Sequence, residues 1–414
     1  MGKVSVQTFL EENKDYLVRL TSELCSFATE NPPGKDFEPC VDFLQGYSES
    51  LGLKTEKIHV PEAYQRRYNS PETFGYPRFN LLARWNVGAE KTLHFNSHFD
   101  VVPVSDDWKT NPFQPVVKQG KLFGRGTCDM KGSLAASLFA VHALKACGLR
   151  PAWNIELSFT ADEEIGGECG VGYLVKNKLV RPDAAVVCEG GSGQAVSFGH
   201  RGVLWADVLV RGVSAHGSNP QAGVNAFEKG IALAERMRAL EKEFRRRKSR
   251  FPLDRPEFAY PTMTLGGVSG GGSKVNTVPD RFHFTIDRRL TPEERVNDVI
   301  KEFNTIIAEA KKKDKTLKAK MHVTRGFDAG ITDKNAPICQ IAKKAVQTVT
   351  GKNATLCIFG AFTDLHFFTG IAKCPTIGYG VEGEGLHGSR EFLKIRSLVE
   401  TARVYAEIMM NSTP

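Results

Sequence analysis

The chain has 414 residues, of which 41% are apolar, so it can bury a large core, and its length suggests two domains. Its nine cysteines form no CxxC pair, and no apolar segment has the length of a membrane span or a signal peptide, which favours a cytoplasmic protein without a membrane partner. The basic residues behind the formal charge of +8 concentrate at 245–250 and 311–313, where helical patterns end, which favours a solvated surface over nucleic-acid binding and leaves a weak bias toward anionic substrates.

The first part of the chain mixes helical and extended patterns. Apolar residues at helical spacing predict a helix over residues 6–28 and a second over about 38–51. Residues 61–80 are polar and rich in aromatics, which indicates a surface loop. A strand is predicted at residues 93–99 and a helix at 131–146.

The first candidate site lies where the strand at residues 93–99 ends. His98 and Asp100 share one face at that point, and strand ends are where α/β proteins place their chemistry. An imidazole with a carboxylate two residues on suits a metal site, in which Asp100 accepts one ring N–H and the other nitrogen binds the ion. A histidine hydrogen-bonded to a turn explains this pair alone equally well.

Further acidic groups favour the metal site. Asp129 lies in a glycine-rich loop before a helix, Glu163 and Glu164 follow the apolar run 155–160, and Glu189 follows the run 184–188. A strand-like run at 374–380 leads to His387. Three acidic sites and two histidines, placed in this way, are hard to explain as solvated turns. Oxygen and nitrogen ligands without cysteine indicate zinc, manganese or cobalt.

The pattern changes near Gly199. The order strand, helix, two strands, helix, strand predicts an inserted α+β module with a split βαβ arrangement. A discontinuous catalytic domain, 1–198 plus 326–414, would then surround an insert at 199–325. Glycines at 266–272 lack the lysine and serine spacing of a phosphate loop and indicate a flexible turn. The predicted strands of the insert are 204–210, 261–268, 281–288 and 317–324, and its helices are 225–243 and 292–312.

Six sequence strings carry a resemblance to a known family. They are SHFDVVPV, GRGTCDMKG, TADEEIGG, VSAHGSNPQAGVNA, VNTVPDRF and LHGSRE, in this order over nearly the whole chain. The chain resembles the di-zinc amidohydrolases that include acetylornithine deacetylase, succinyl-diaminopimelate desuccinylase, carboxypeptidase G and the aminoacylases. The resemblance implies an α/β fold, in which a mixed-sheet, metallopeptidase-like catalytic domain carries an inserted α+β (βαββαβ) lid or dimerisation domain.

The resemblance also implies a reaction centre. Its metal ligands would be Asp129, bridging two Zn²⁺ ions, with His98 and Glu189 on one ion and Glu164 and His387 on the other. Co²⁺ or Mn²⁺ could replace zinc. Glu163 would be the general base and Asp100 the partner of His98. Two ions about 3.5 to 4 Å apart can share a hydroxide and polarise an amide carbonyl. The peptide after Asp129 is usually cis in the family.

By the same resemblance, the insert contributes substrate-binding residues. His216 would stabilise the oxyanion as a catalytic residue, while Asn276 and Arg289 would hold a substrate carboxylate, which a guanidinium fork binds bidentately. Each alone is equally compatible with a capping, turn or surface role. Arg288 alternates to the other face of its strand and is predicted to be solvated. In dimeric relatives the histidine reaches the partner subunit's site, which predicts a homodimer.

The string at residues 359–364 contains Gly360, a further expected substrate-binding position, and departs from the family pattern at Phe362. His366 stands where the desuccinylases have an arginine, and Arg390 where an amide or acid is usual. These departures argue against N-succinyl-diaminopimelate and leave an N-acyl-amino acid or dipeptide as the substrate. The alternatives are a dizinc aminopeptidase on free amino termini and a catalytically silent binding protein, which would not need to retain Glu163.

Overall fold

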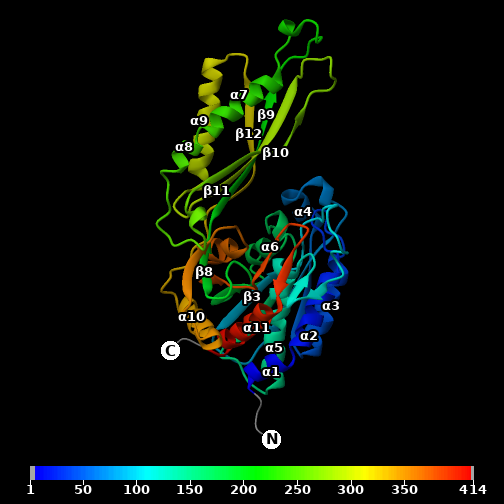
Figure 1. Cartoon of the computed structure of the whole chain (residues 1–414), viewed down its shortest axis with the longest axis vertical. Coiled ribbons are helices and arrows are strands. Elements are labelled where there is room, and N and C mark those ends of the chain that lie inside the picture. The colour runs from blue at the N-terminus through cyan, green and yellow to red at the C-terminus, as the bar shows by residue number, and fades with distance from the viewer. Residues whose placement is uncertain (1–4, 412–414) are drawn as a thin grey trace. The chain divides into compact units, whose positions relative to one another are not determined.

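The computed structural model describes residues 5–411. The chain divides into two compact units. The first contains the described residues up to Gly199, Ile331–Phe359 and those from Thr363 onward, and the second contains His200–Gly330 and Gly360–Phe362. Both units combine helices with sheets, which confirms the predicted α/β class (Figure 1).

The first unit is built on an eight-stranded mixed sheet. Strand β3 pairs in parallel with both β6 and β7, and β14 pairs in parallel with β7. Parallel neighbours end at the same edge of a sheet, so the residues after β3, β6 and β7 are brought together there. The strand order is β1 (Lys54–Val60), β2 (Arg78–Trp85), β6 (Asn154–Thr160), β3 (Thr92–His98), β7 (Ala184–Val187), β14 (Thr376–Gly378), β8 (Ala195–His200), β13 (Thr355–Phe359).

Helices pack around this sheet. Helix α5 is buried on nearly all sides and contacts α1, α2 and α11, while α3 covers β1 and β2 (Figure 1). A small sheet has the order β15, β16, β5, β4. The bounds are α1 (Val6–Glu12), α2 (Lys14–Ser26), α3 (Phe37–Ser50), α4 (Glu62–Tyr68), α5 (Gly132–Ala146), α6 (Val171–Lys176), α10 (Pro337–Thr350), α11 (Ile395–Met410), β4 (Val116–Lys118), β5 (Lys121–Phe123), β15 (Gly383–Glu384) and β16 (Phe392–Lys394).

Two N-terminal predictions need correction. The helix predicted over residues 6–28 is interrupted at Asn13, whose side-chain Nδ2 donates to the carbonyl of Phe9 at 2.8 Å and so competes with the helical pattern. The predicted loop 61–80 contains α4 and the start of β2.

All nine cysteines are free thiols. Among residues 5–411, every helix is too short or too polar to cross a membrane.

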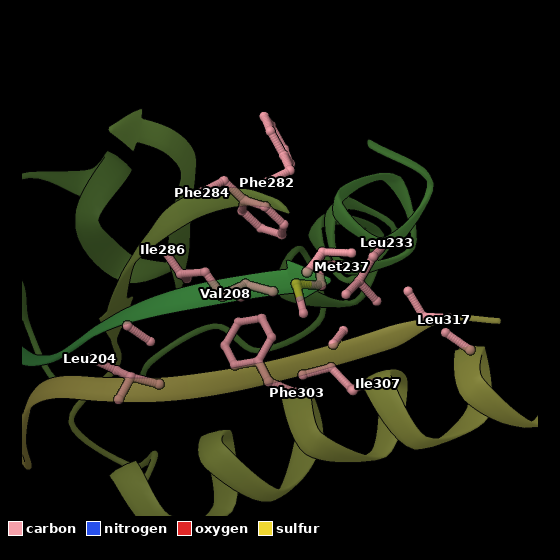
Figure 2. Close-up of a cluster of buried hydrophobic side chains, with 14 of the residues drawn as sticks. Leu204, Val208, Leu233, Met237, Phe282, Phe284, Ile286, Phe303, Ile307 and Leu317 are labelled. Atoms are coloured by element: carbon pink, nitrogen blue, oxygen red, sulfur yellow. The ribbon is translucent and has the colours of Figure 1, made fainter. Parts of the chain in front are cut away.

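The second unit is an antiparallel four-stranded sheet with the order β10, β11, β9, β12. Helices α7 and α9 contact each other and the sheet, and Figure 2 shows the core that they close over it. Phe303 and Ile307 of α9 meet Leu204 and Val208 of β9 in this core. The predicted order of elements is confirmed, except that the single helix predicted over 225–243 is divided into α7 and α8: β9 (Gly202–Arg211), α7 (Ala226–Arg238), α8 (Glu241–Phe244), β10 (Thr262–Gly271), β11 (Arg281–Leu290), α9 (Val296–Lys313), β12 (Lys318–Phe327).

The prediction of a solvated Arg288 is wrong. This residue lies on the helix-covered face of β11, is 0% exposed, and pairs with Glu294 at 2.6 Å while its guanidinium lies over the ring of Phe244. Arg247, from the basic run expected to face water, is half-buried and pairs with Glu302 at 2.5 Å. Arg288 and Arg289 lie on opposite faces of β11, as the alternation predicts, but the face that carries Arg288 is the one that the helices cover.

Candidate metal centre

The site begins at the shared edge of β3, β6 and β7. His98 is the last residue of β3, the turn Glu163–Ile165 follows β6, and Glu189 stands two residues after β7. The amide of Phe99 donates to the carbonyl of Thr160 at 3.0 Å, so the pairing of β3 and β6 continues into the site. Asp129 lies in the turn Thr127–Lys131 before α5, and the Asp129–Met130 peptide is cis, as the resemblance implies.

Asp129 lies between two imidazoles. Nε2 of His98 is 3.2 Å from its Oδ1, and Nε2 of His387 is 3.2 Å from its Oδ2. His387 Nε2 is also 3.3 Å from Oε2 of Glu164. One ligand atom from each of His98, Asp129 and Glu164 lies within 4.8 Å of the others. A carboxylate that directs each oxygen to a different imidazole can bridge two cations, each held by one of the histidines.

The unpaired atoms at the site fit a metal ion. Oε1 of Glu189 and Nε2 of His98 are buried and make no hydrogen bond of acceptable geometry among the described residues, although Nε2 of His98 lies 3.2 Å from Asp129. Buried polar atoms normally have a partner, and an imidazole nitrogen with carboxylate oxygens is the donor set that zinc, cobalt or manganese takes. The residues present therefore suit divalent cations.

The pKa values of the buried carboxyls also fit a site for divalent cations. Burial raises the pKa of Glu164 to about 7, with a further contribution from the negative charge of Asp129. Burial also raises the pKa of Glu163 well above its ordinary value, and the charge of Glu189 adds to it. Burial raises the pKa of Glu189 as well. Crowded, desolvated carboxylates of this kind are stabilised in their charged form by bound cations.

A raised pKa has the opposite meaning for an imidazole, because it favours the charged form. Hydrogen bonding to Asp129, supported by Glu164, raises the pKa of His387 to about 10. Burial opposes ionisation of Asp129, but contact with His387 and His98 outweighs it and holds the pKa of this carboxyl below its ordinary value. The pKa of Asp129 is therefore lowered, whereas the pKa values of Glu163, Glu164 and Glu189 are raised.

Asp100 organises the turn that carries Glu163 and Glu164. Its carboxylate accepts the backbone N–H of Glu163 at 3.3 Å and that of Glu164 at 3.2 Å, and it accepts Nδ2 of Asn31 at 2.8 Å. His98 Nδ1 is 3.0 Å from the backbone carbonyl of Asp100 and 3.5 Å from its Oδ1. The closer acceptor of the ring N–H is thus the carbonyl, whereas the carboxylate was expected.

The sequence model of peptidase family M20/M25/M40 matches residues 94–411. The chain belongs to this family. An uncharacterized metallohydrolase of Methanocaldococcus jannaschii is 29% identical over 413 residues, covering 95% of this chain and 98% of the relative. The acetylornithine deacetylase of Klebsiella pneumoniae is 31% identical over 287 residues, 68% of each protein. The structure of the dipeptidase Dug1p from Saccharomyces cerevisiae has a TM-score of 0.79 at 17% identity, covering 98% of this chain and 97% of its own, so the fold is shared.

Membership of the M20/M25/M40 family confirms the resemblance found in the sequence and makes this chain a metal-dependent hydrolase. The family match includes all five residues that the resemblance implies as ligands, because it runs from residue 94 to residue 411. The individual roles of those residues stay predictions.

A buried polar network behind the site was not predicted. Asp162, next to Glu163, accepts Nε of Arg78 at 2.7 Å and Nδ2 of Asn31 at 2.9 Å. Nδ2 of Asn69 donates to its second oxygen at 2.5 Å. Asp162 was visible as the first acid of its motif. Its partners carry no motif signal and lie far away in the chain, so sequence spacing could not have identified them.

Glu391 is a second residue whose contact was missed. Its carboxylate accepts the backbone N–H of Cys128 at 2.9 Å and of Asp129 at 3.1 Å, and it pairs with Nη1 of Arg125 at 2.7 Å. Arg125 and Glu391 stand in two of the M20-type motif strings, GRGTCDMKG and LHGSRE. The available signal in the sequence was an arginine in the first motif and a glutamate in the second, because these two residues could form an ion pair.

The second unit brings together only some of the residues expected to bind substrate. The amide of Gly217, beside His216, donates to the carbonyl of Asn276 at 2.8 Å, and His216 forms a bridge with Thr277. Both His216 and Asn276 are exposed. They lie beyond the Arg281 end of β11, whereas Arg289 is near its other end. Eight residues of extended strand span roughly 25 Å, and a dipeptide about 7 Å, so one small substrate cannot contact both places within one chain.

Three of the remaining positions, Gly360, Phe362 and His366, are packed against neighbouring residues. A Cβ at Gly360 would lie 1.8 Å from a ring carbon of Phe258, so this position excludes any side chain. Phe362 stacks on Phe327 with ring centroids 5.2 Å apart. His366 is buried, and its Nδ1 lies 2.9 Å from the carbonyl of Thr363. Arg390 is exposed. A substrate-binding role for Gly360 stays a prediction.

Proposed function

We propose that this M20/M25/M40 metallohydrolase cleaves the amide bond of an N-acyl-amino acid or a dipeptide next to a free carboxylate. The observation that carries the proposal is Asp129 between His98 and His387, with Glu163 alongside at 3.9 Å from His98 Nε2. The relative named acetylornithine deacetylase and the fold shared with a protein described as a dipeptidase support the substrate class.

The proposed cofactor is a pair of Zn²⁺ ions, with Asp129 as the bridge, His98 and Glu189 on one ion, and Glu164 and His387 on the other. When bound, such ions act as Lewis acids and lower the pKa of water. Glu163 takes the proton of the attacking water and passes it to the leaving amine. Burial raises the pKa of Glu163, which makes its carboxylate a stronger base. Asp100 fixes its backbone for this role.

Substrate recognition in this proposal uses two chains. Arg289 of one chain binds the carboxylate of the substrate, whereas His216 of the partner subunit stabilises the oxyanion and Asn276 of the partner subunit also contacts the carboxylate. The roughly 25 Å of strand between these positions within one chain supports this division. A two-fold homodimer places the same residues of each chain in the other's site.

A substrate panel tests the function. Protein stripped by a chelator is reconstituted with Zn²⁺, Co²⁺ or Mn²⁺ and assayed with N-acyl-amino acids, dipeptides and aminoacyl amides that lack the carboxylate. Hydrolysis of the first two groups, abolished by the chelator and by Glu163→Gln, is expected. Preferential cleavage of the aminoacyl amides would indicate an aminopeptidase instead. No hydrolysis of any substrate by the reconstituted protein would indicate a silent binding member.

A further inference from the structure

The guanidinium of Arg289 is already held on one side by Asp287. Nε donates to Oδ1 at 2.8 Å and Nη2 donates to Oδ2 at 2.9 Å, which is a bidentate pair. The two residues are two positions apart on β11, so their side chains share the face that the helices leave open. Their side chains are 31% and 37% exposed, so substrate-sized molecules can reach the pair.

Trp205 supports the same guanidinium from the neighbouring strand. It is the residue of β9 directly opposite Asp287 in the register, and its ring centroid lies 6.0 Å from Cζ of Arg289. Guanidinium groups are attracted to the face of an indole ring at this range. An aromatic face and a side-on carboxylate together restrict both the plane and the rotation of the guanidinium.

The donors left over form a second fork. A guanidinium has five N–H groups, one on Nε and two on each Nη. Asp287 uses the Nε–H and one Nη2–H. Among the described residues, nothing else accepts a hydrogen bond from this side chain. One N–H of Nη1 and the second N–H of Nη2 remain on the end of the group, parallel to each other, which is the geometry that binds another carboxylate bidentately.

We infer that Asp287 is a positioning residue, which presents the Nη1–Nη2 edge of Arg289 to the carboxylate of the substrate. The inference rests on the proposed function, in which Arg289 binds that carboxylate. A free arginine side chain samples many rotamers and must be ordered when a ligand binds, whereas Asp287 orders it beforehand. Because the two carboxylates use different edges, Asp287 assists the substrate and does not compete with it.

Steady-state kinetics of Asp287→Ala show whether Asp287 helps Arg289 to bind the substrate carboxylate or competes with that carboxylate for Arg289. KM for a carboxylate substrate should rise about three- to tenfold, the factor expected for ordering one long side chain on binding, with kcat little changed. KM for the carboxamide analogue should stay the same, which also shows that the variant is folded. Asp287→Asn, which keeps one acceptor oxygen, should show a smaller rise. A KM that falls for the carboxylate substrate would mean competition and overturn the inference.

Asp207→Ala is the matched control. Asp207 lies on the same open face of the sheet, where it is paired in register with Thr285. Its substitution removes the same charge as Asp287→Ala, but Asp207 makes no hydrogen bond with Arg289. An equal rise in KM for Asp207→Ala would show that loss of any negative charge on this face weakens substrate binding, which would overturn the inference. The variant Arg289→Lys distinguishes failure of the role inferred for Asp287 from failure of the proposed function. If Arg289→Lys affects the carboxylate and carboxamide substrates equally, Arg289 is not the clamp and both proposals fail. If it is selective and Asp287→Ala is not, only the role of Asp287 fails.

Discussion

Glu391 accepts the backbone N–H of Asp129 at 3.1 Å, so a residue near the C-terminal end of the chain fixes the acid at the centre of the candidate metal centre. The other oxygen of Glu391 pairs with Arg125, and the two side chains are 0% and 1% exposed. A buried charge that loses its partner is strongly destabilising. The contact therefore joins the stability of the fold to the position of Asp129.

Glu391→Ala should lower the free energy of unfolding by about 3 to 5 kcal/mol, because it leaves the Arg125 charge and the amides of Cys128 and Asp129 without acceptors. Glu391→Gln keeps an acceptor of the same shape and should lose less. Urea titration of the metal-free proteins measures both. A loss for Glu391→Ala below about 0.5 kcal/mol, typical of surface positions, would show that the pair does not stabilise the fold.

Glu163→Gln should lower turnover by about 10² to 10⁴-fold and leave the metal content unchanged, because the glutamine cannot move the proton while the predicted ligands stay intact. Turnover and bound metal are measured on the same preparation. Metal depletion in this variant would make Glu163 a ligand and reverse its assignment relative to Glu164.

Arg289→Lys should lower kcat/KM for carboxylate substrates by about 10- to 100-fold, since lysine keeps the charge but loses the planar fork. The carboxamide analogue lacks this contact and should change little. Parallel assays with the two substrates measure the difference. Equal losses would show that Arg289, which is paired with Asp287, has a structural role.

Mixing two inactive variants tests the shared site of the homodimer. Glu163→Ala chains and His216→Ala chains are allowed to exchange subunits. Half of the dimers are then mixed, and each mixed dimer has one site with both residues intact, so about a quarter of wild-type activity should return. Exchange is verified with differently tagged chains. Activity that stays at the parental level after verified exchange would place His216 in its own chain's site or outside catalysis.

The strands that carry the candidate site could be predicted from the sequence, because each run is apolar and ends abruptly at a polar residue. His98 and Glu189 follow two such runs, and the parallel pairing of β3 with β7 then brings them to one edge of the sheet. The order of elements in the second unit could be predicted from periodicity, since its strands alternate between polar and apolar residues and its helices are amphipathic.

Other features depend on information that periodicity does not contain. Alternation along β11 separates Arg288 from Arg289 but does not say which face the helices cover, so Arg288 was assigned to solvent. The contacts of Asn31 with Asp100 and Asp162 join residues that are 69 and 131 positions apart, and only the folded chain defines them. The pairing of Asp287 with Arg289 needed side-chain rotamers as well as strand register.

Metal analysis of the wild-type protein beside Asp129→Ala and His387→Ala tests the central claim most directly. If Asp129 bridges two ions through the two oxygens that face His98 and His387, the wild-type chain should bind two Zn²⁺ ions. Asp129→Ala should then lose both ions, whereas His387→Ala should keep the one held by His98 and Glu189. A wild-type chain that binds a single ion, or an Asp129→Ala chain that keeps two, would contradict the account.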